Sequence, residues 1–194
     1  MNVYSSKTIA NEFINMARNE GRSLNSIELN CLVYFASVEA MTSSRGQNML
    51  ITDAFEARDC GPVCRSLANE FGLSKAPIEN FASEGHMYNE RKNDFARTSG
   101  FIPVSDAQAY SIVSHTWNDY KGLSCEELQK EAKEGDSPWF RAHSFGEGSY
   151  INNSDIMDCY FLRDEKPKSV KRVEPVAPNV SEKTRGFFNG ASFA

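Results

Sequence analysis

The segment that most constrains the fold is "SIELNCLVYFASVEAM", which begins at Ser26 and is apolar on almost every side. Asn25 precedes it and Glu28 follows three residues later, a spacing typical of an N-terminal capping box. The run is too long for a strand, so we expect a helix over residues 26–42 despite its aromatic and β-branched content. A helix that is apolar all round is usually the buried centre of a bundle. We therefore predict a mainly α-helical protein packed around this helix.

Shorter helices are expected on both sides of the central one. Residues 7–19 carry apolar side chains at positions i, i+4, i+7 and i+8, which is the pattern of one helical face, and Gly21 follows as a stop signal. Further along the chain, capping signals predict where later helices begin: Ser105 with Gln108, Ser124 with Glu127, Ser137 with Pro138, and Asn153 or Ser154.

Short strands are expected at two or three places. Residues 49–51 form either one short strand or a first helical turn, and the polar segment 72–104 is expected to contain a small hairpin. Between these segments, Gly61 is expected to take a positive φ at a turn, and Pro62 to occupy the first position of a helix over residues 62–71. The predicted fold class is therefore mainly α: a compact helical bundle around a buried central helix, with two or three short strands.

The composition changes near the C-terminal end. Residues 163–194 contain three prolines and many charges without a periodic pattern, which predicts a disordered tail. We expect one helical domain over residues 1–162, followed by this tail. The tail ends in the apolar residues Phe187, Phe188 and Phe193, which are candidate partner-binding residues, because a few aromatic side chains can anchor a segment that folds on binding.

The charge is divided unevenly along the chain. The net charge is −5, but residues 1–162 carry about −8 and residues 163–194 about +3. An acidic body argues against nucleic acid as a partner and suits a protein partner. The sequence shows no signal peptide and no apolar run long enough to span a bilayer, so we expect no membrane partner. A reducing cytoplasm is the expected location, in keeping with the sparse cysteines.

Cys60 and Cys64 flank a Gly-Pro step and raise the question of a metal or redox pair. Structural zinc sites commonly use two Cys-x2-Cys pairs, because four ligands must converge on the ion. Here the spacing is Cys-x3-Cys, and the sequence holds no second pair. A thioredoxin-like pair would need Cys-x2-Cys in a β-α-β setting. We therefore predict that both cysteines are small, buried apolar residues and that the Gly-Pro turn is the important feature.

Other candidate chemistry is equally sparse. His86, His115 and His143 are far apart and form no metal-binding pair, and nothing marks a Ser/His or Cys/His arrangement. The glycine-rich stretch 146–149 lacks the lysine and the preceding strand of a phosphate loop, so it is interpreted as a turn. We predict no catalytic residue, no metal ligand and no cofactor. An enzyme without a recognisable motif remains an alternative.

Several short motifs follow one another in a characteristic order: "ANEFI", "LNSIELNCLVYFA", "AFEARDCGPVCRSLANEFG", "WNDYKGLSCEEL", "SPWFRA", "INNSDI" and "YF". This order resembles the Panacea domain, an antitoxin-associated domain of bacteria and phages whose members include SocA-like and GepA-like proteins. The resemblance covers about residues 7–162. Besides the segment 123–128, its most specific markers are these structural-motif residues: Phe55, Glu56, Ala57, Gly61, Pro62, Val63, Leu128, Pro138 and Trp139.

The resemblance implies a non-catalytic protein-binding module that neutralises a toxin directly or presents it to a protease as an adaptor. The chain also departs from the family pattern. Arg58 and Cys60 each stand where the family usually has an aromatic residue, and Ala132-Lys133 replace a usual Thr-His pair. These departures indicate a diverged, phage-borne member with a different partner, which makes Arg58 a candidate partner-binding residue. The alternative is a phage-encoded inhibitor of a host defence or regulatory protein.

Overall fold

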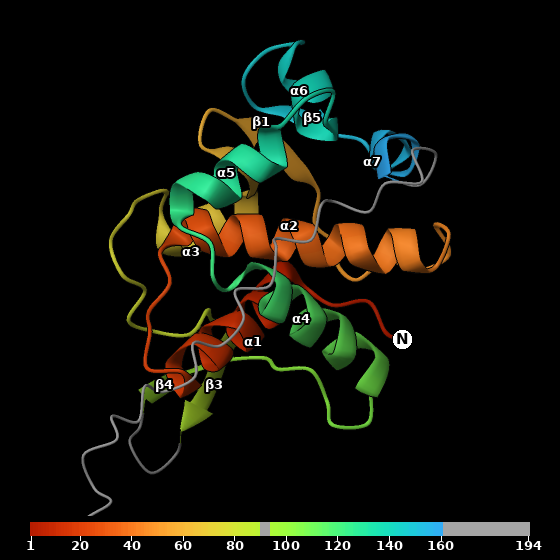
Figure 1. The fold of residues 1–194 in the computed structure, drawn as a ribbon. Coiled ribbons are helices and arrows are strands. Elements are labelled where there is room, and N and C mark those ends of the chain that lie inside the picture. Colours follow the sequence, from red (N-terminus) through yellow and green to blue (C-terminus); the bar gives the residue numbers. More distant parts are fainter. Residues whose placement is uncertain (90–93, 161–194) are drawn as a thin grey trace, which may run out of the picture.

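The computed structural model describes residues 1–89 and 94–160. Within these residues, seven helices and five short strands surround one hydrophobic core (Figure 1), so the predicted mainly α fold is confirmed. The helices are α1 Ser6–Asn19, α2 Ser26–Ser43, α3 Arg65–Phe71, α4 Ala107–Tyr120, α5 Cys125–Lys133, α6 Pro138–His143 and α7 Asn153–Tyr160. The strands are β1 Phe55–Arg58, β2 Gly61–Cys64, β3 Gly85–Asn89, β4 Asp94–Thr98 and β5 Ser149–Ile151.

The central helix α2 runs through the middle of the molecule, as its all-round apolar sequence predicts. It lies between α1 and α4 on one side and α5 with the small β-sheet on the other (Figure 1). The predicted capping box is present: Asn25 Oδ1 accepts from the backbone N of Glu28 (3.0 Å), and Glu28 Oε2 accepts from the backbone N of Asn25 (2.9 Å). Nearly every side chain of α2 between Ser26 and Met41 is buried. The helix therefore forms the core that positions the other elements.

The remaining helix starts follow the sequence signals with two exceptions, at α4 and at α3. The capping box at Ser124 and the Ser137 cap of α6 are confirmed. The capping box predicted at Ser105 is wrong, because α4 is capped by Asp106, whose carboxylate accepts from the backbone N of Ala109 (3.1 Å). The other oxygen of Asp106 accepts from the backbone N of Asn2 (2.7 Å). This contact with the N-terminal segment holds Asp106 at the N-terminus of α4.

The predicted helix over residues 62–71 is also wrong in its first turn. Gly61 does take a positive φ of 113°, but the chain then returns along β1, where Gly61 pairs with Arg58, and the helix begins only at Arg65. Pro62 lies in β2, an edge strand of the sheet order β2-β1-β5, where its missing N–H leaves no ladder hydrogen bond unmade. Pairing between strands thus overrides the local helix-start signal of Pro62.

The three-stranded sheet turns its inner face toward α2. Phe55 and Ala57 of β1 are buried on that side. The expected turn at residues 146–149 is present, with positive φ at Gly146 and Gly148, but it leads into β5 rather than directly into the last helix. β5 has three residues, too few to give a periodic pattern, and it was not predicted.

Two other segments complete the comparison with the sequence. The hairpin expected within residues 72–104 is confirmed as β3 and β4. Residues 49–51 form neither a strand nor a helical turn, because only Ile51 makes an isolated bridge, to Tyr4.

None of the helices in the described part of the chain is long and apolar enough to cross a membrane. The tail residues Phe187, Phe188 and Phe193, and the boundary at residue 162, lie outside the described residues.

Candidate protein-binding face

The motif residues that are scattered along the sequence gather around the three-stranded sheet. Residues 55–57 lie in β1 and residues 61–63 in β2, while α5 packs against β2 and α6 packs against β1 and β5. The indole Nε1 of Trp139 donates to the backbone oxygen of Arg58 (3.0 Å), which ties α6 to the end of β1. Segments that are more than 80 residues apart in sequence therefore form one structural unit.

Most of these motif residues are part of the core. Phe55 meets Tyr34 of α2 edge-on, with ring centroids 5.2 Å apart and planes at 85°. Trp139 is 8% exposed, as its predicted core position requires. The other buried motif residues are Ala57, Gly61, Pro62, Val63, Leu128 and Pro138. Their role in the structure is to hold the sheet against α2, α5 and α6.

Glu56 differs from its neighbours because it is a charged residue with only 1% exposure. Since side chains alternate along a strand, it faces away from the core side of β1. Two guanidinium groups cover it: Nε and Nη2 of Arg58 donate to Oε2 (3.0 and 2.6 Å), and Nε and Nη2 of Arg65 donate to Oε1 (2.9 and 2.5 Å). Each carboxylate oxygen thus receives two hydrogen bonds from one arginine.

The electrostatic balance at Glu56 favours its charged form. Burial raises the pKa of the carboxyl group, but the hydrogen bonds from Arg58 and Arg65 and their positive charges outweigh burial, so the pKa of Glu56 lies below its ordinary value. One negative charge is therefore enclosed by two positive ones, which leaves this group of three with a charge of +1 at neutral pH.

The two arginines reach solvent although their carboxylate does not. Their side chains are 38% exposed for Arg58 and 66% exposed for Arg65. A guanidinium group carries five N–H donors, and each of these two uses only Nε and Nη2 toward Glu56. Within residues 1–89 and 94–160, neither Nη1 donates a hydrogen bond. Both groups therefore present fixed donors at the surface.

The turn between β1 and β2 is held by side chains from two helices. His143 Nε2 lies 3.0 Å from Asp59 Oδ1, and the His143 ring stacks on Trp139 with centroids 4.4 Å apart. Lys133 of α5 donates to the backbone oxygen of Asp59 (3.0 Å), and its Nζ lies 5.4 Å from the centre of the Trp139 ring. The turn that precedes Gly61 is consequently anchored on both sides.

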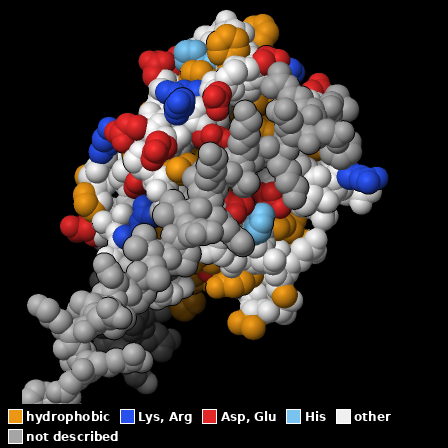
Figure 2. Space-filling model, in the orientation of Figure 1, with side chains coloured by type: hydrophobic (Ala, Val, Ile, Leu, Met, Phe, Trp, Pro, Cys, Tyr) orange, Lys and Arg blue, Asp and Glu red, His pale blue; other side chains and the backbone are white. Residues whose placement is uncertain are grey.

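Exposed aromatic side chains lie at the same end of the molecule. Phe140 on α6 is 53% exposed, Phe145 in the following turn 87%, and Tyr150 on β5 56%. Tyr150 is the cross-strand partner of Glu56. Figure 2 shows hydrophobic side chains at the end where Figure 1 places α6 and β5. We call this surface the sheet-end face, and it consists of Glu56, Arg58, Arg65, Phe140, Phe145 and Tyr150.

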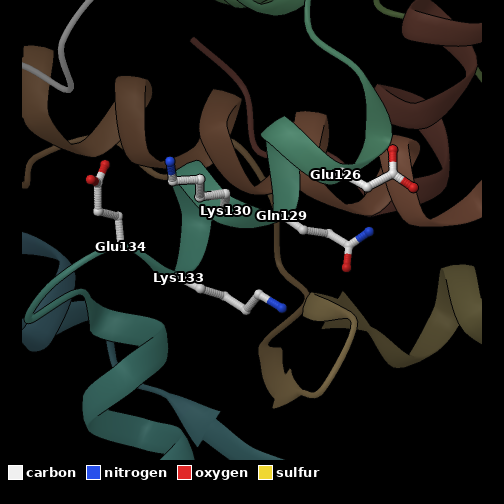
Figure 3. Close-up of a pocket in the computed structure, with 5 residues that line it drawn as sticks. All are labelled: Glu126, Gln129, Lys130, Lys133 and Glu134. Carbon is white, nitrogen blue, oxygen red and sulfur yellow. The ribbon is translucent and has the colours of Figure 1, made fainter.

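A hollow with a volume of about 460 Å³ lies along α5 (Figure 3). Its lining residues come from α5 and from the residue that directly follows it, and their charges have both signs: Glu126, Gln129, Lys130, Lys133 and Glu134. Lys133 extends toward the β1–β2 hairpin and Lys130 points away from it (Figure 3). A mixed lining on one side of a single helix does not select a ligand of either charge.

The cysteines do not form a paired site. Cys64 is fully buried, as predicted, and burial raises the pKa of its thiol. Cys60 is only half-buried, contrary to the prediction, because it lies in the two-residue turn between β1 and β2. None of the five cysteines forms a disulfide, and no group of three or more His, Cys, Asp or Glu side chains within the described residues could hold a metal ion.

Sequence reasoning found part of this face and missed part of it. It singled out Glu56 and Arg58, but not Arg65, Phe140 or Tyr150. The alternation in "FEAR", with two apolar residues separated by a charged one, was the signal that places Glu56 opposite the core. The hairpin that brings Arg65 back to Glu56 could not be inferred while residues 62–71 were expected to be one helix.

Comparison with known proteins gives no match: no family model, no curated protein and no solved structure is similar to this chain. The resemblance to the Panacea domain therefore remains an expectation from the motif order.

Proposed function

We propose that the protein is a non-catalytic protein-binding module of the bacterial cytoplasm, which neutralises a toxin directly or presents it to a protease as an adaptor. The observation that carries this proposal is the sheet-end face, where exposed aromatic residues accompany two fixed arginines. Aromatic residues and arginine are the residue types most enriched at the energetic centres of protein interfaces.

The buried part of the same unit supports this function. A binding face needs a backbone that does not rearrange, since ordering it on binding would reduce affinity. Here Trp139, His143 and Lys133 fasten the β1–β2 turn to α5 and α6. The motif residues that carry the family resemblance lie in this support. The resemblance and the exposed face therefore point to the same part of the molecule.

The departure at Arg58 favours a second candidate function. An exposed arginine where the family usually has an aromatic residue changes the chemistry of the surface without changing its support. A phage-encoded inhibitor that occupies the surface of a host defence or regulatory protein would use the same face on a different partner. Both functions require a protein partner, and neither requires catalysis.

Co-expression tests the proposed function. The gene is expressed together with each small reading frame that lies beside it in the genome and that proves toxic when expressed alone, and growth and toxin abundance are followed. Restored growth with unchanged toxin abundance supports direct neutralisation, and restored growth with a shortened toxin lifetime supports the adaptor role. If no toxin is rescued, but affinity purification and mass spectrometry identify one host protein, the inhibitor is the correct candidate. Turnover of a small molecule by the purified protein would contradict both.

A pair of surface variants shows whether the sheet-end face is used. Phe140→Ser with Phe145→Ser should abolish the rescue, because it removes two exposed aromatic side chains. The control is Val104→Ser, which removes a fully exposed apolar side chain in the loop before α4. Equal rescue by all variants would place the interface elsewhere.

A further inference from the structure

We propose that Arg58 and Arg65, held by Glu56 and flanked by Tyr150, receive a carboxylate-bearing segment of the protein partner. This inference rests on the proposed function, since it names the chemistry of the partner that the sheet-end face binds. The occupant is an acidic stretch of polypeptide that also carries an apolar side chain.

The geometry of the two arginines suits carboxylate recognition. Each guanidinium is fixed through Nε and Nη2 to one oxygen of Glu56, so its position is set before any ligand arrives. The Nη1 donors and the remaining Nη2 proton are left to face outward. Arginine is the side chain best matched to a carboxylate, because its planar fork forms two parallel hydrogen bonds. Prior fixation reduces the entropy lost on binding.

The local charge contrasts with that of the rest of the body. Glu56 with its two arginines carries +1, whereas residues 1–162 carry about −8. Two acidic residues lie near this group: Glu147, whose charge acts on Arg58, and Asp59, which is paired with His143. An acidic ligand is therefore attracted by the two guanidinium groups at contact distance and is repelled more strongly by the rest of the acidic body, which confers specificity as well as affinity.

The aromatic neighbour distinguishes a polypeptide from a nucleic acid. Tyr150 lies opposite Glu56 in the strand register and exposes more than half of its surface. Its ring offers an apolar contact beside the arginines. A long polyanion such as RNA would need a broad cationic surface, and the acidic body opposes it. A short acidic segment with one apolar side chain needs only the two arginines and the ring.

Peptide selection tests the inference without knowledge of the partner. A random peptide library is selected on the immobilised full-length protein, and the enriched peptides are measured by fluorescence anisotropy. We expect enrichment of Asp and Glu next to an apolar residue. Arg58→Gln with Arg65→Gln should weaken binding about tenfold or more, because truncating charged hydrogen-bonding partners is costly. The control pair Arg45→Gln with Lys130→Gln removes the same charge at exposed sites elsewhere and should change affinity less than about twofold.

A second variant keeps the test valid if the double arginine variant fails to fold. Removing both arginines leaves Glu56 buried without partners, which can unfold the chain. The triple change Glu56→Gln, Arg58→Gln and Arg65→Gln removes all three charges, and a thermal melt verifies that it is folded. The folded triple variant should also lose peptide binding, and Tyr150→Ser in the wild-type background should weaken it.

Three results would overturn the inference: selected peptides without acidic residues, unchanged binding by the folded triple variant, or equally tight binding of a single-stranded oligonucleotide of matched charge. These results are distinguishable from failure of the proposed function. If the wild type and the triple variant neutralise a toxin equally well, the proposed function stands and the proposed carboxylate-binding site is wrong. If acidic peptides bind through the arginines but the protein rescues no toxin, the proposed site is supported and the antitoxin role is wrong.

Discussion

Two glutamates are buried in different regions of the described part of the chain, and their surroundings shift the pKa of the carboxyl group in opposite directions. Glu12 lies in α1 and is 5% exposed, and its carboxylate accepts from the backbone N of Ile102 (2.7 Å). Burial raises the pKa of Glu12 by more than this hydrogen bond lowers it. Glu56 in β1 is even less exposed, yet the pKa of its carboxyl lies below the ordinary value, because Arg58 and Arg65 outweigh burial.

The two environments give the two buried carboxyl groups different structural roles. Glu12 ties the loop that follows the β3–β4 hairpin to the first helix, and a neutral amide could make the same hydrogen bond to Ile102. Glu56 needs its charge, since it holds two guanidinium groups in place at the surface. The α1 region uses a buried acid for packing, while the sheet uses one to position exposed cations.

The largest expected effect on stability comes from a buried side chain beneath the sheet-end face, and not from either of the two carboxylates. Trp139→Ala should reduce the free energy of unfolding by about 3–5 kcal/mol, because it removes a buried ring and the hydrogen bond to Arg58. Urea denaturation measures the loss. Its neighbour Phe140 is exposed, so Phe140→Ala should stay within about 0.5 kcal/mol. Equal effects from the two substitutions would show that α6 does not anchor β1.

A matched pair of charge removals tests the comparison itself. Glu56→Gln should lower the free energy of unfolding at neutral pH by about 1–2 kcal/mol, because an amide N–H2 then faces a guanidinium group. This value is at the lower end for charged hydrogen bonds, since both arginines reach solvent. Glu12→Gln should leave stability unchanged or raise it, because the amide oxygen still accepts from Ile102 and no charge is buried. A larger loss of stability for Glu12→Gln than for Glu56→Gln would mean that the charge of Glu12, and not that of Glu56, stabilises the fold.

The pH dependence of the same two variants sharpens this prediction. The stabilisation from Glu56 is present above its unfolded pKa of about 4.3 and is lost as pH falls through its lower folded pKa. The destabilisation of Glu56→Gln should therefore shrink in acid. Glu12 has the opposite sign: its raised folded pKa gives stability in acid that is lost as pH rises through that pKa. Thermal melts across this pH range should show the two differences from wild type changing in opposite directions.

A further substitution tests the turn that brings Arg65 back to Glu56. Gly61→Val should destabilise by more than about 1 kcal/mol, because a β-branched residue is strained at a φ of 113°. The added Cβ would also lie 3.6 Å from Cys31 Sγ, an ordinary contact, so the strain comes from the backbone. Gly122→Val is the control, since open space surrounds that position. An unchanged melting temperature for Gly61→Val would mean that the hairpin tolerates a different turn.

Features encoded by neighbouring residues were predictable from the sequence. The capping boxes at Asn25 and Ser124 involve groups three residues apart, and the apolar surface of α2 is visible within one segment. The Pro62 prediction failed because proline suits both a helix start and an edge strand, and only pairing with β1 decides between them.

The two glutamate environments could not be predicted, because their partners are distant or depend on the hairpin. Glu12 meets Ile102 across 90 residues, and no pattern in α1 indicates that its apolar stripe includes a buried acid. Glu56 and Arg65 are nine residues apart, and this separation predicts no contact unless the chain reverses at Gly61. The exposure of Phe140 beside the buried Trp139 likewise depends on how the short helix α6 lies on β1 and β5.

The most direct test is a carbon-13 NMR titration of the side-chain carboxyl carbons of Glu12 and Glu56 in the wild-type protein, with resonances assigned from the two Glu→Gln variants. The account predicts that Glu56 titrates below the ordinary glutamate pKa of about 4.3 and that Glu12 titrates above it. If both carboxyl groups titrate near the ordinary value, or if their order is reversed, Glu56 does not hold Arg58 and Arg65 as described, and the sheet-end face loses its charged centre.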